Sequence, residues 1–189
     1  MKRHFYDVEL DVYVPGRWYL AEPTDLSGQE IPDVWIFDGG RPVDDPGPLR
    51  VPIDYPGRPL DYTTAGVSGP VLSARAASVL RELAPRDVQL FPVEVEGETE
   101  PYFLLNVVKT VRCIDDVASG EVRRYTPEDN RPDRVGEYRA VHSLRIDPSK
   151  VGDERVFRPW GWHPALIVDA GIKEALERTG FVGPLFDPV

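Results

Sequence analysis

Apolar and acidic residues alternate near the start of the chain. Apolar residues recur at every second position from Tyr6 to Val14, and Asp7 and Glu9 fall on the opposite face. A period of two residues is typical of a strand that packs one face on a core and exposes the other. The pattern therefore predicts a half-buried strand over residues 5–14, closed by a proline–glycine pair.

Two apolar runs in the middle of the chain, residues 88–95 and 102–108, flank a Glu-Gly-Glu turn. Short strand-like runs on either side of a glycine turn predict a β-hairpin. The second run is apolar on both faces, so we expect it at the centre of a sheet, with residues 111–114 extending it. Pro92 cannot donate a backbone hydrogen bond, which places the first run at an edge or a bulge.

Further strand patterns follow towards the C-terminus. Residues 119–136 are polar and predict a long loop. Alternation over residues 138–146 then predicts a strand with His142 on its apolar face, where a core histidine is the expected role. Val156 begins the next strand, and the apolar run at 165–168 predicts another. These runs are short and are bounded by glycine, proline or charged residues, as strands usually are.

Two stretches have the spacing of an amphipathic helix. The first begins after Ser73, a residue type that caps helix N-termini, and ends before Pro85. The second begins after Asp169 and has its buried face at i, i+3, i+4 and i+7 from Ile172, with charged residues on the other face. Gly180 then supplies a left-handed stop. The sequence therefore predicts two short helices.

Prolines and aspartates dominate residues 41–59, where proline excludes a helix. The stretch can be read as a linker between an N-terminal annex and a main domain. Apolar residues alternate from Val51 to Tyr55, however, which favours an ordered loop that carries an edge strand. We therefore expect residues 1–60 to form strands and a proline-rich loop packed on a main domain at residues 61–189.

The predicted strands outnumber the predicted helices and cluster as hairpins. This combination indicates an α+β fold with a largely antiparallel sheet and two or more short helices. The 189 residues are enough for a single sizeable core, to which the irregular proline-rich N-terminal part is added.

The net charge of −10 limits the classes of partner. It argues against binding to nucleic acid or to an anionic membrane, because both require a basic protein surface. It is compatible with a basic partner, and acidity also serves solubility alone. No apolar run approaches the ~20 residues of a membrane span, and the N-terminus lacks the apolar segment of a secretory signal, so we expect a cytoplasmic protein.

Candidate catalytic residues are few. The single cysteine, Cys113, excludes an internal disulfide and falls in an apolar pattern where a free cysteine is usually a small core residue. The three histidines lack metal-ligand spacing, and the sequence has no phosphate-binding or nucleophile-elbow motif. We therefore expect no catalytic residue, metal or cofactor. The alternative is a small-ligand-binding domain or an enzyme with a pocket near Cys113, Asp115 and His142.

Residues 160–163, Trp-Gly-Trp-His, have the most unusual local composition of the chain. Two indoles around a glycine can anchor a protein interface or form a platform for a small molecule. They can also belong to a turn whose tryptophans fold back on the core. All three interpretations stay open at this point.

Three blocks of the sequence resemble a known family. They are YFLLNVVKTVRCIDDVASG at residues 102–120, IDPSKVGDERVFRP at 146–159 and LIVDAGIKEALERTGFVGPLFDPV at 166–189. In order and spacing they resemble a bacterial immunity-protein family of polymorphic toxin systems that is abundant in myxobacteria. The resemblance implies a non-catalytic cytoplasmic protein that binds and neutralises a cognate toxin domain. It supplies no active-site residues.

An immunity protein must cover the active or partner-binding face of its toxin. If the toxin is a nuclease, that face is basic, so an acidic cover speeds association and favours the right partner. The acidic loop at residues 38–60 is stiffened by prolines, which lowers the ordering cost of binding. The carboxylates of this loop and the two indoles are the predicted partner-binding residues, namely Asp38, Asp44, Asp45, Asp54, Trp160 and Trp162.

Overall fold

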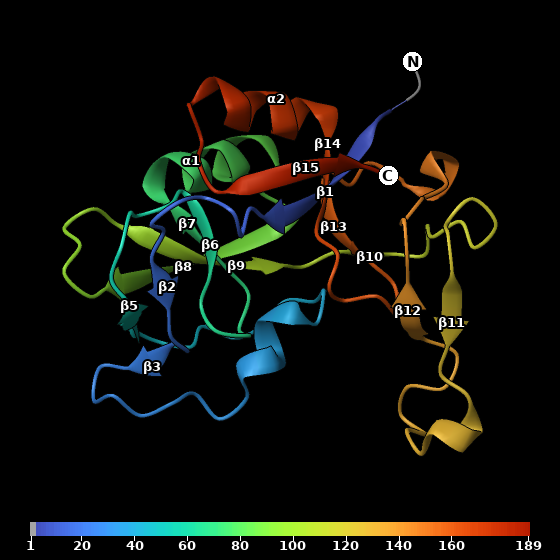
Figure 1. The fold of residues 1–189 in the computed structure, drawn as a ribbon, viewed down its shortest axis with the longest axis horizontal. Coiled ribbons are helices and arrows are strands. Elements are labelled where there is room, and N and C mark those ends of the chain that lie inside the picture. Colours follow the sequence, from blue (N-terminus) through green and yellow to red (C-terminus); the bar gives the residue numbers. More distant parts are fainter. Residues whose placement is uncertain (1–2) are drawn as a thin grey trace.

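Two β-sheets, two strand ribbons and two α-helices form the protein in a computed structural model, which describes residues 3–189 (Figure 1). The six-stranded sheet runs, from edge to edge, through β3 (Thr24–Asp25), β4 (Leu49–Val51), β8 (Val88–Val95), β9 (Tyr102–Val107), β7 (Pro70–Ser73) and β6 (Tyr62–Thr64). The five-stranded sheet runs through β10 (Thr110–Val111), β13 (Val156–Pro159), β14 (Ile167–Asp169), β1 (Phe5–Leu10) and β15 (Pro184–Pro188). The ribbons pair β2 (Tyr19–Leu20) with β5 (Ile53–Tyr55), and β11 (Val122–Arg124) with β12 (Tyr138–Val141).

The strand pairs are antiparallel in both sheets and both ribbons, except for β4 with β8 and β10 with β13. The α-helices are α1 (Ala74–Leu83) and α2 (Ala170–Arg178), and the 3-10 helices are η1 (Val34–Asp38), η2 (Pro127–Asp129) and η3 (Pro148–Lys150). The predicted α+β class with a largely antiparallel sheet is therefore confirmed. No helix among residues 3–189 is long and apolar enough to cross a membrane.

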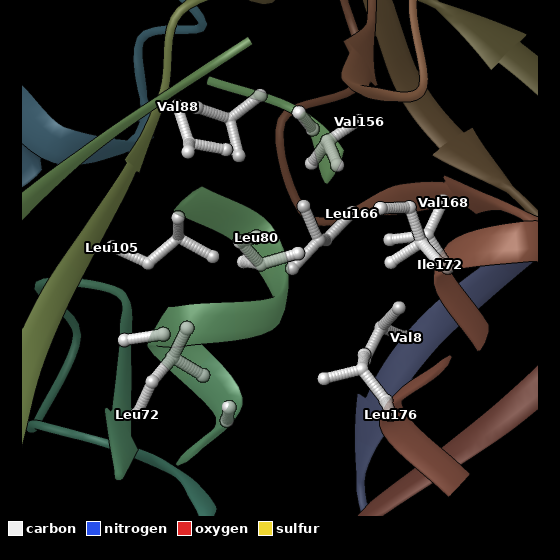
Figure 2. Packing of buried hydrophobic residues seen from close by; sticks show 14 of the residues in the cluster. Val8, Leu72, Leu80, Val88, Leu105, Val156, Leu166, Val168, Ile172 and Leu176 are labelled. Atoms are coloured by element: carbon white, nitrogen blue, oxygen red, sulfur yellow. The ribbon is translucent and has the colours of Figure 1, made fainter. Parts of the chain in front are cut away.

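A hydrophobic cluster forms where the two sheets meet the two helices (Figure 2). Val8 of β1, Leu80 of α1 and Ile172 of α2 are buried in it together with Leu105 of β9. The neighbouring Leu104 faces a second cluster on the other side of the six-stranded sheet. β9 is therefore buried on both faces and lies between β8 and β7, which confirms the predicted central position.

Local sequence signals define both helices as predicted. The side chain of Ser73 accepts a hydrogen bond from the backbone N–H of Ala76 and caps α1. Asp169 Oδ1 accepts from the N–H of Ile172 at 2.9 Å and caps α2. Gly180 follows α2 with a φ of +71°, a backbone conformation that glycine adopts without steric cost. Caps and stops act over a few residues, so the sequence predicts them well.

The hairpin of β8 and β9 is also confirmed, and Pro92 explains how far its outer side is paired. Pro92 is opposite Phe103 of β9. On the other side, the parallel pairing with β4 begins only at Val93. The edge or bulge predicted from Pro92 is therefore wrong, because β8 lies between β4 and β9; the proline is tolerated because it precedes the part of β8 that pairs with β4.

The first strand is shorter and more deeply buried than its alternation predicts. β1 pairs with β14 on one side and β15 on the other, and it ends at Leu10, so Val12 beyond it is exposed. Asp7, predicted on a polar face, is buried, and its Oδ1 accepts a hydrogen bond from the Leu166 N–H at 3.0 Å. The polar face of β1 is therefore covered at Asp7 and exposed at Glu9, which an alternating pattern cannot reveal.

Three predictions after β9 are wrong. Residues 111–114 do not extend β9, because the chain crosses to the five-stranded sheet, where β10 pairs in parallel with β13. The predicted loop at 119–136 contains β11 and η2. The strand predicted over 138–146 ends at Val141, because Ser143 has a φ of +48°, and His142 is exposed rather than in the core.

The proline-rich part of the chain contributes one strand to the six-stranded sheet and one strand to a ribbon. β4 pairs with β8 and is one strand in from the sheet edge, whereas β5 pairs with β2 in a ribbon. Two short strands, β4 and β5, thus stand in place of the single edge strand that was predicted.

Candidate functional site

A groove of about 1030 Å³ runs between residues 45–52 and the turn that joins β8 to β9. Its walls carry the carboxylates of Asp45, Glu94, Glu96, Glu98 and Glu100. Among the described residues that line it, Arg50 is the one base, and its guanidinium pairs with Glu94 at 3.1 Å. Within residues 3–189, no ion pair joins the other four carboxylates to a base. We call this hollow the acidic groove.

The folding of β8 and β4 explains why acids gather there. In β8, Val93 and Val95 are buried and the intervening Glu94 is exposed. The chain then turns at Gly97, whose φ is +77°, and the turn presents the next glutamates. Parallel pairing of β4 with β8 brings the loop that contains Asp45 alongside them. Two acidic segments that are distant in sequence therefore share one groove.

An exposed pair of tyrosines lies on the ribbon of β2 and β5, and β5 follows β4 directly in the chain. Tyr55 of β5 is 64 % exposed. Its ring packs edge-on against the ring of Tyr19 on β2, with 5.9 Å between the two ring centres. The guanidinium of Arg17 lies 4.0 Å from the centre of the Tyr19 ring. Asp54, which precedes Tyr55, is exposed too. We call these four residues the aromatic ribbon. Tyrosine and arginine, which supply three of them, are enriched in the most strongly contributing positions of protein interfaces.

A second hollow, of about 930 Å³, is lined by η1 and by residues 131–137. In Figure 1, η1 lies below the sheets, and the hairpin of β11 and β12 extends away from the body. Trp35 of η1 and Val67 both line the hollow. Trp35 is 60 % exposed and Val67 is 46 % exposed. Arg131 and Arg134 also line it. We call this hollow the η1 cleft.

Arg158 and its partners occupy the inner part of the η1 cleft. The Arg158 side chain is almost fully buried, and it donates a hydrogen bond to Asp38 Oδ1 at 2.6 Å. The imidazole Nδ1 of His163 lies 2.8 Å from the backbone oxygen of Asp38. Burial raises the pKa of Asp38, and the charges of Arg158 and His163 oppose that rise. These contacts fasten η1 to the turn between β13 and β14.

The six predicted partner-binding residues are distributed over several places. Asp45 lines the acidic groove, Asp44 is its exposed neighbour, and Asp54 belongs to the aromatic ribbon. Asp38 instead lies in the η1 cleft. The remaining two positions are Trp160 and Trp162.

Both tryptophans of the Trp-Gly-Trp-His turn are half-buried and pack against the third core cluster. The guanidinium of Arg112 lies 3.3 Å from the centre of the Trp160 ring. Trp162 lines a different hollow, which it shares with Asp7. Neither indole lines the acidic groove or the η1 cleft.

The alternative pocket near Cys113 lacks the geometry of a nucleophile with a base. Cys113 and Asp115 line a hollow of about 380 Å³, whereas His142 does not. Burial raises the pKa of the Cys113 thiol to about 12, so the reactive thiolate is scarce at neutral pH. Asp115 Oδ1 accepts hydrogen bonds from the N–H groups of Val117 and Ala118, both at 3.0 Å, and thereby holds a turn.

The sequence pattern did not reveal three features of these hollows. Glu94 and Glu96 read as solvated strand residues, and the strand pairing that adds Asp45 to them is not visible in sequence. Arg158 follows two buried residues of β13 and carried no signal, because its partner Asp38 is 120 residues away. The exposed Trp35 lies in a short apolar segment that resembles core sequence.

A comparison with models of protein families gives one match that spans most of the chain. The family model described as the immunity protein family (Imm11) matches residues 11–189. The chain belongs to the Imm11 immunity protein family. The match includes all three blocks on which the resemblance to an immunity protein rested, and that expectation is confirmed. A search of curated proteins found no match.

Both hollows of this Imm11 chain lie within the matched region. The acidic groove is lined by residues 45–101 and the η1 cleft by residues 35–166. Membership of an immunity protein family points to toxin neutralisation as the class of function. It directs attention to surfaces that can bind another protein, and away from the buried Cys113.

Proposed function

We propose that this Imm11 protein neutralises a cognate bacterial toxin domain in the cytoplasm by binding it, without catalysis, and that the acidic groove forms part of the binding surface. The observation that carries the proposal is the surplus of carboxylates in the groove, five against one arginine. A surface with that surplus attracts a basic partner and repels an acidic one.

The chemistry of the groove indicates what the toxin presents. Lysine and arginine side chains on a protruding element would meet the glutamates of the β8–β9 turn, with no competing base except Arg50. A nuclease has such a basic face, because it binds phosphates. An acidic cover over that face blocks the substrate and also speeds the encounter between the two proteins. We therefore propose a basic, nuclease-like partner.

The aromatic ribbon adds the apolar part that a tight interface requires. Charge alone contributes mainly to association rate and specificity, whereas buried aromatic side chains contribute most of the free energy at many interfaces. Tyr19 and Tyr55 stay exposed although their rings contact each other, and the π face of a tyrosine suits lysine and arginine side chains. We propose that they pack against the toxin beside the groove.

Co-expression tests this function. The C-terminal domain of the protein encoded immediately upstream is taken as the candidate toxin. It is expressed alone and together with this protein, and growth and co-purification are measured. We expect the toxin to stop growth, and the protein to restore growth and to co-purify with the toxin in a stable complex. If the toxin stops growth, and the protein neither restores growth nor co-purifies with the toxin, the proposal is contradicted.

The groove is tested in the same assay by a charge-reversed variant, Glu96→Lys with Glu98→Lys. A matched control reverses two exposed glutamates on the helices, Glu82→Lys with Glu174→Lys, and so changes the net charge equally. We expect rescue and co-purification to be lost for the groove variant and kept for the control. An equal effect of both variants would indicate a dependence on net charge rather than on the groove.

A further inference from the structure

The η1 cleft is lined by an exposed tryptophan that does not belong to any of the three core clusters. Trp35 is 60 % exposed, although tryptophan is usually well buried in a folded domain. η1 is nevertheless held firmly, because Asp33 Oδ1 caps the Trp35 N–H at 3.0 Å and Phe37 is buried in the second core cluster. A large indole on a fixed short helix is thus presented to solvent at the mouth of the cleft.

A second observation comes from inside the cleft. Arg158 is 3 % exposed, and two of its three guanidinium nitrogens donate hydrogen bonds, to Asp38 and to backbone oxygens. Its Nε–H has no partner among the residues of this structure. A buried donor of a charged group without an acceptor costs free energy, and a bound partner that supplies the acceptor would remove that cost. A partner whose oxygen accepts a hydrogen bond from this Nε–H would therefore bind more tightly.

The charge of the cleft differs from that of the acidic groove. Each arginine that lines it has a carboxylate partner, in the pairs Arg131–Asp133, Arg134–Glu137 and Arg158–Asp38. The lining is therefore neutral as a whole. It suits an apolar segment with one oxygen acceptor rather than a strongly basic one.

We infer that the η1 cleft receives a loop of the toxin, which places an apolar side chain against Trp35 and Val67 and a carbonyl or carboxylate oxygen near Nε of Arg158. The inference rests on the proposed function, because it takes the toxin as the partner. It adds a second, charge-neutral contact region to the acidic groove. The balance of charge in the cleft and the one unmatched donor select this occupant.

Two variants test the contact, with the purified C-terminal domain of the protein encoded immediately upstream, the candidate toxin, as the probe. Trp35→Ala removes the indole, and Val67→Arg fills the cleft with a long side chain. Tyr13→Ala is the control, since Tyr13 is 86 % exposed and lines neither hollow. All three positions are exposed, so unfolding curves should match that of the wild-type protein, and Kd is measured by calorimetry.

We expect Kd to rise about 10–100-fold for Trp35→Ala and for Val67→Arg, and less than about twofold for Tyr13→Ala. Amide hydrogen exchange in the wild-type complex should slow over residues 34–38. Wild-type binding with unchanged Kd for both cleft variants and no slowing at η1 would overturn the inference and leave the proposed function intact. Absence of wild-type binding would instead overturn the proposed function itself.

Discussion

Arg50 of β4 and Glu94 of β8 are opposite each other in a parallel strand pair, and their side chains form an ion pair at 3.1 Å. This pairing ties the proline-rich N-terminal part to the central hairpin. It also neutralises one of the five carboxylates of the acidic groove, and the other four have no ion-pair partner among residues 3–189. The groove therefore stays acidic although one base lines it.

The acidic loop beside the groove should control how fast the toxin binds. We predict that the variant Asp44→Lys, Asp45→Lys and Asp54→Lys lowers the association rate constant about 10-fold or more at low salt, because steering by opposite charge is lost. Stopped-flow binding to the toxin domain over a range of ionic strength checks this. The rate of the wild-type protein should fall steeply with salt, and that of the variant should not. Equal rates and equal salt dependence would exclude the loop from the interface.

The aromatic ribbon should affect how long the complex lasts. We predict that Tyr55→Ala raises the dissociation rate constant about 10-fold or more, because a buried tyrosine at an interface commonly contributes more than 1 kcal/mol. Tyr55→Phe keeps the ring and should stay close to wild type. Surface-based kinetics with the toxin domain distinguish the two variants. A normal dissociation rate for Tyr55→Ala would show that the ribbon lies outside the contact.

Asp7 should make the stability of the protein depend on pH. Burial raises its pKa to about 7 from an ordinary 3.8, while the hydrogen bond from the Leu166 N–H acts in the opposite direction. The folded state therefore binds a proton that the unfolded state releases between about pH 4 and 7. Stability should fall as pH rises through that window and stay level above it.

The variant Asp7→Asn tests this dependence, since the amide oxygen can still accept from Leu166. We predict that it raises the free energy of unfolding at pH 8 by about 3–4 kcal/mol, and by little at pH 4. Urea unfolding at both pH values measures the difference, with the exposed Glu174→Gln as control. The same gain at both pH values would rule out titration of Asp7 as the cause.

The buried ion pair in the η1 cleft should matter for stability. Asp38→Ala leaves the Arg158 guanidinium buried without its carboxylate, and we predict a loss of about 3–5 kcal/mol in the free energy of unfolding. Asp153→Ala removes the carboxylate of the exposed pair with Arg86 and should change little. Chemical denaturation compares the two. Similar small effects would mean that Arg158 finds another acceptor or water.

Local signals account for the parts of the fold that the sequence predicts well. Ser73 and Asp169 cap their helices through bonds to residues three positions away, and the β8–β9 turn joins neighbouring strands. The chain crossing to β10 and the exposure of His142 depend on tertiary context and on a left-handed residue at Ser143, which the apolar pattern did not indicate. Alternation describes faces, and it cannot tell which sheet covers them.

The candidate sites show the same limit more strongly. The charge of the chain and the acidic loop directed attention to Asp45, and the structure places it in a groove with four glutamates. The parallel pairing that forms this groove joins segments about 44 residues apart, and no local pattern encodes it. Asp38 reads as one more loop carboxylate in sequence, but burial beside Arg158 gives it a different role.

Removal of charge from the acidic groove tests the proposed binding of the toxin domain. The most direct measurement is the Kd of the purified pair at physiological salt for the wild-type protein and for the variant Glu96→Gln, Glu98→Gln and Glu100→Gln, which removes charge but keeps shape. We expect tight wild-type binding, a Kd at least 100-fold weaker for this variant, and loss of protection in co-expressing cells. A variant that binds and protects as the wild-type protein does would contradict the proposed binding.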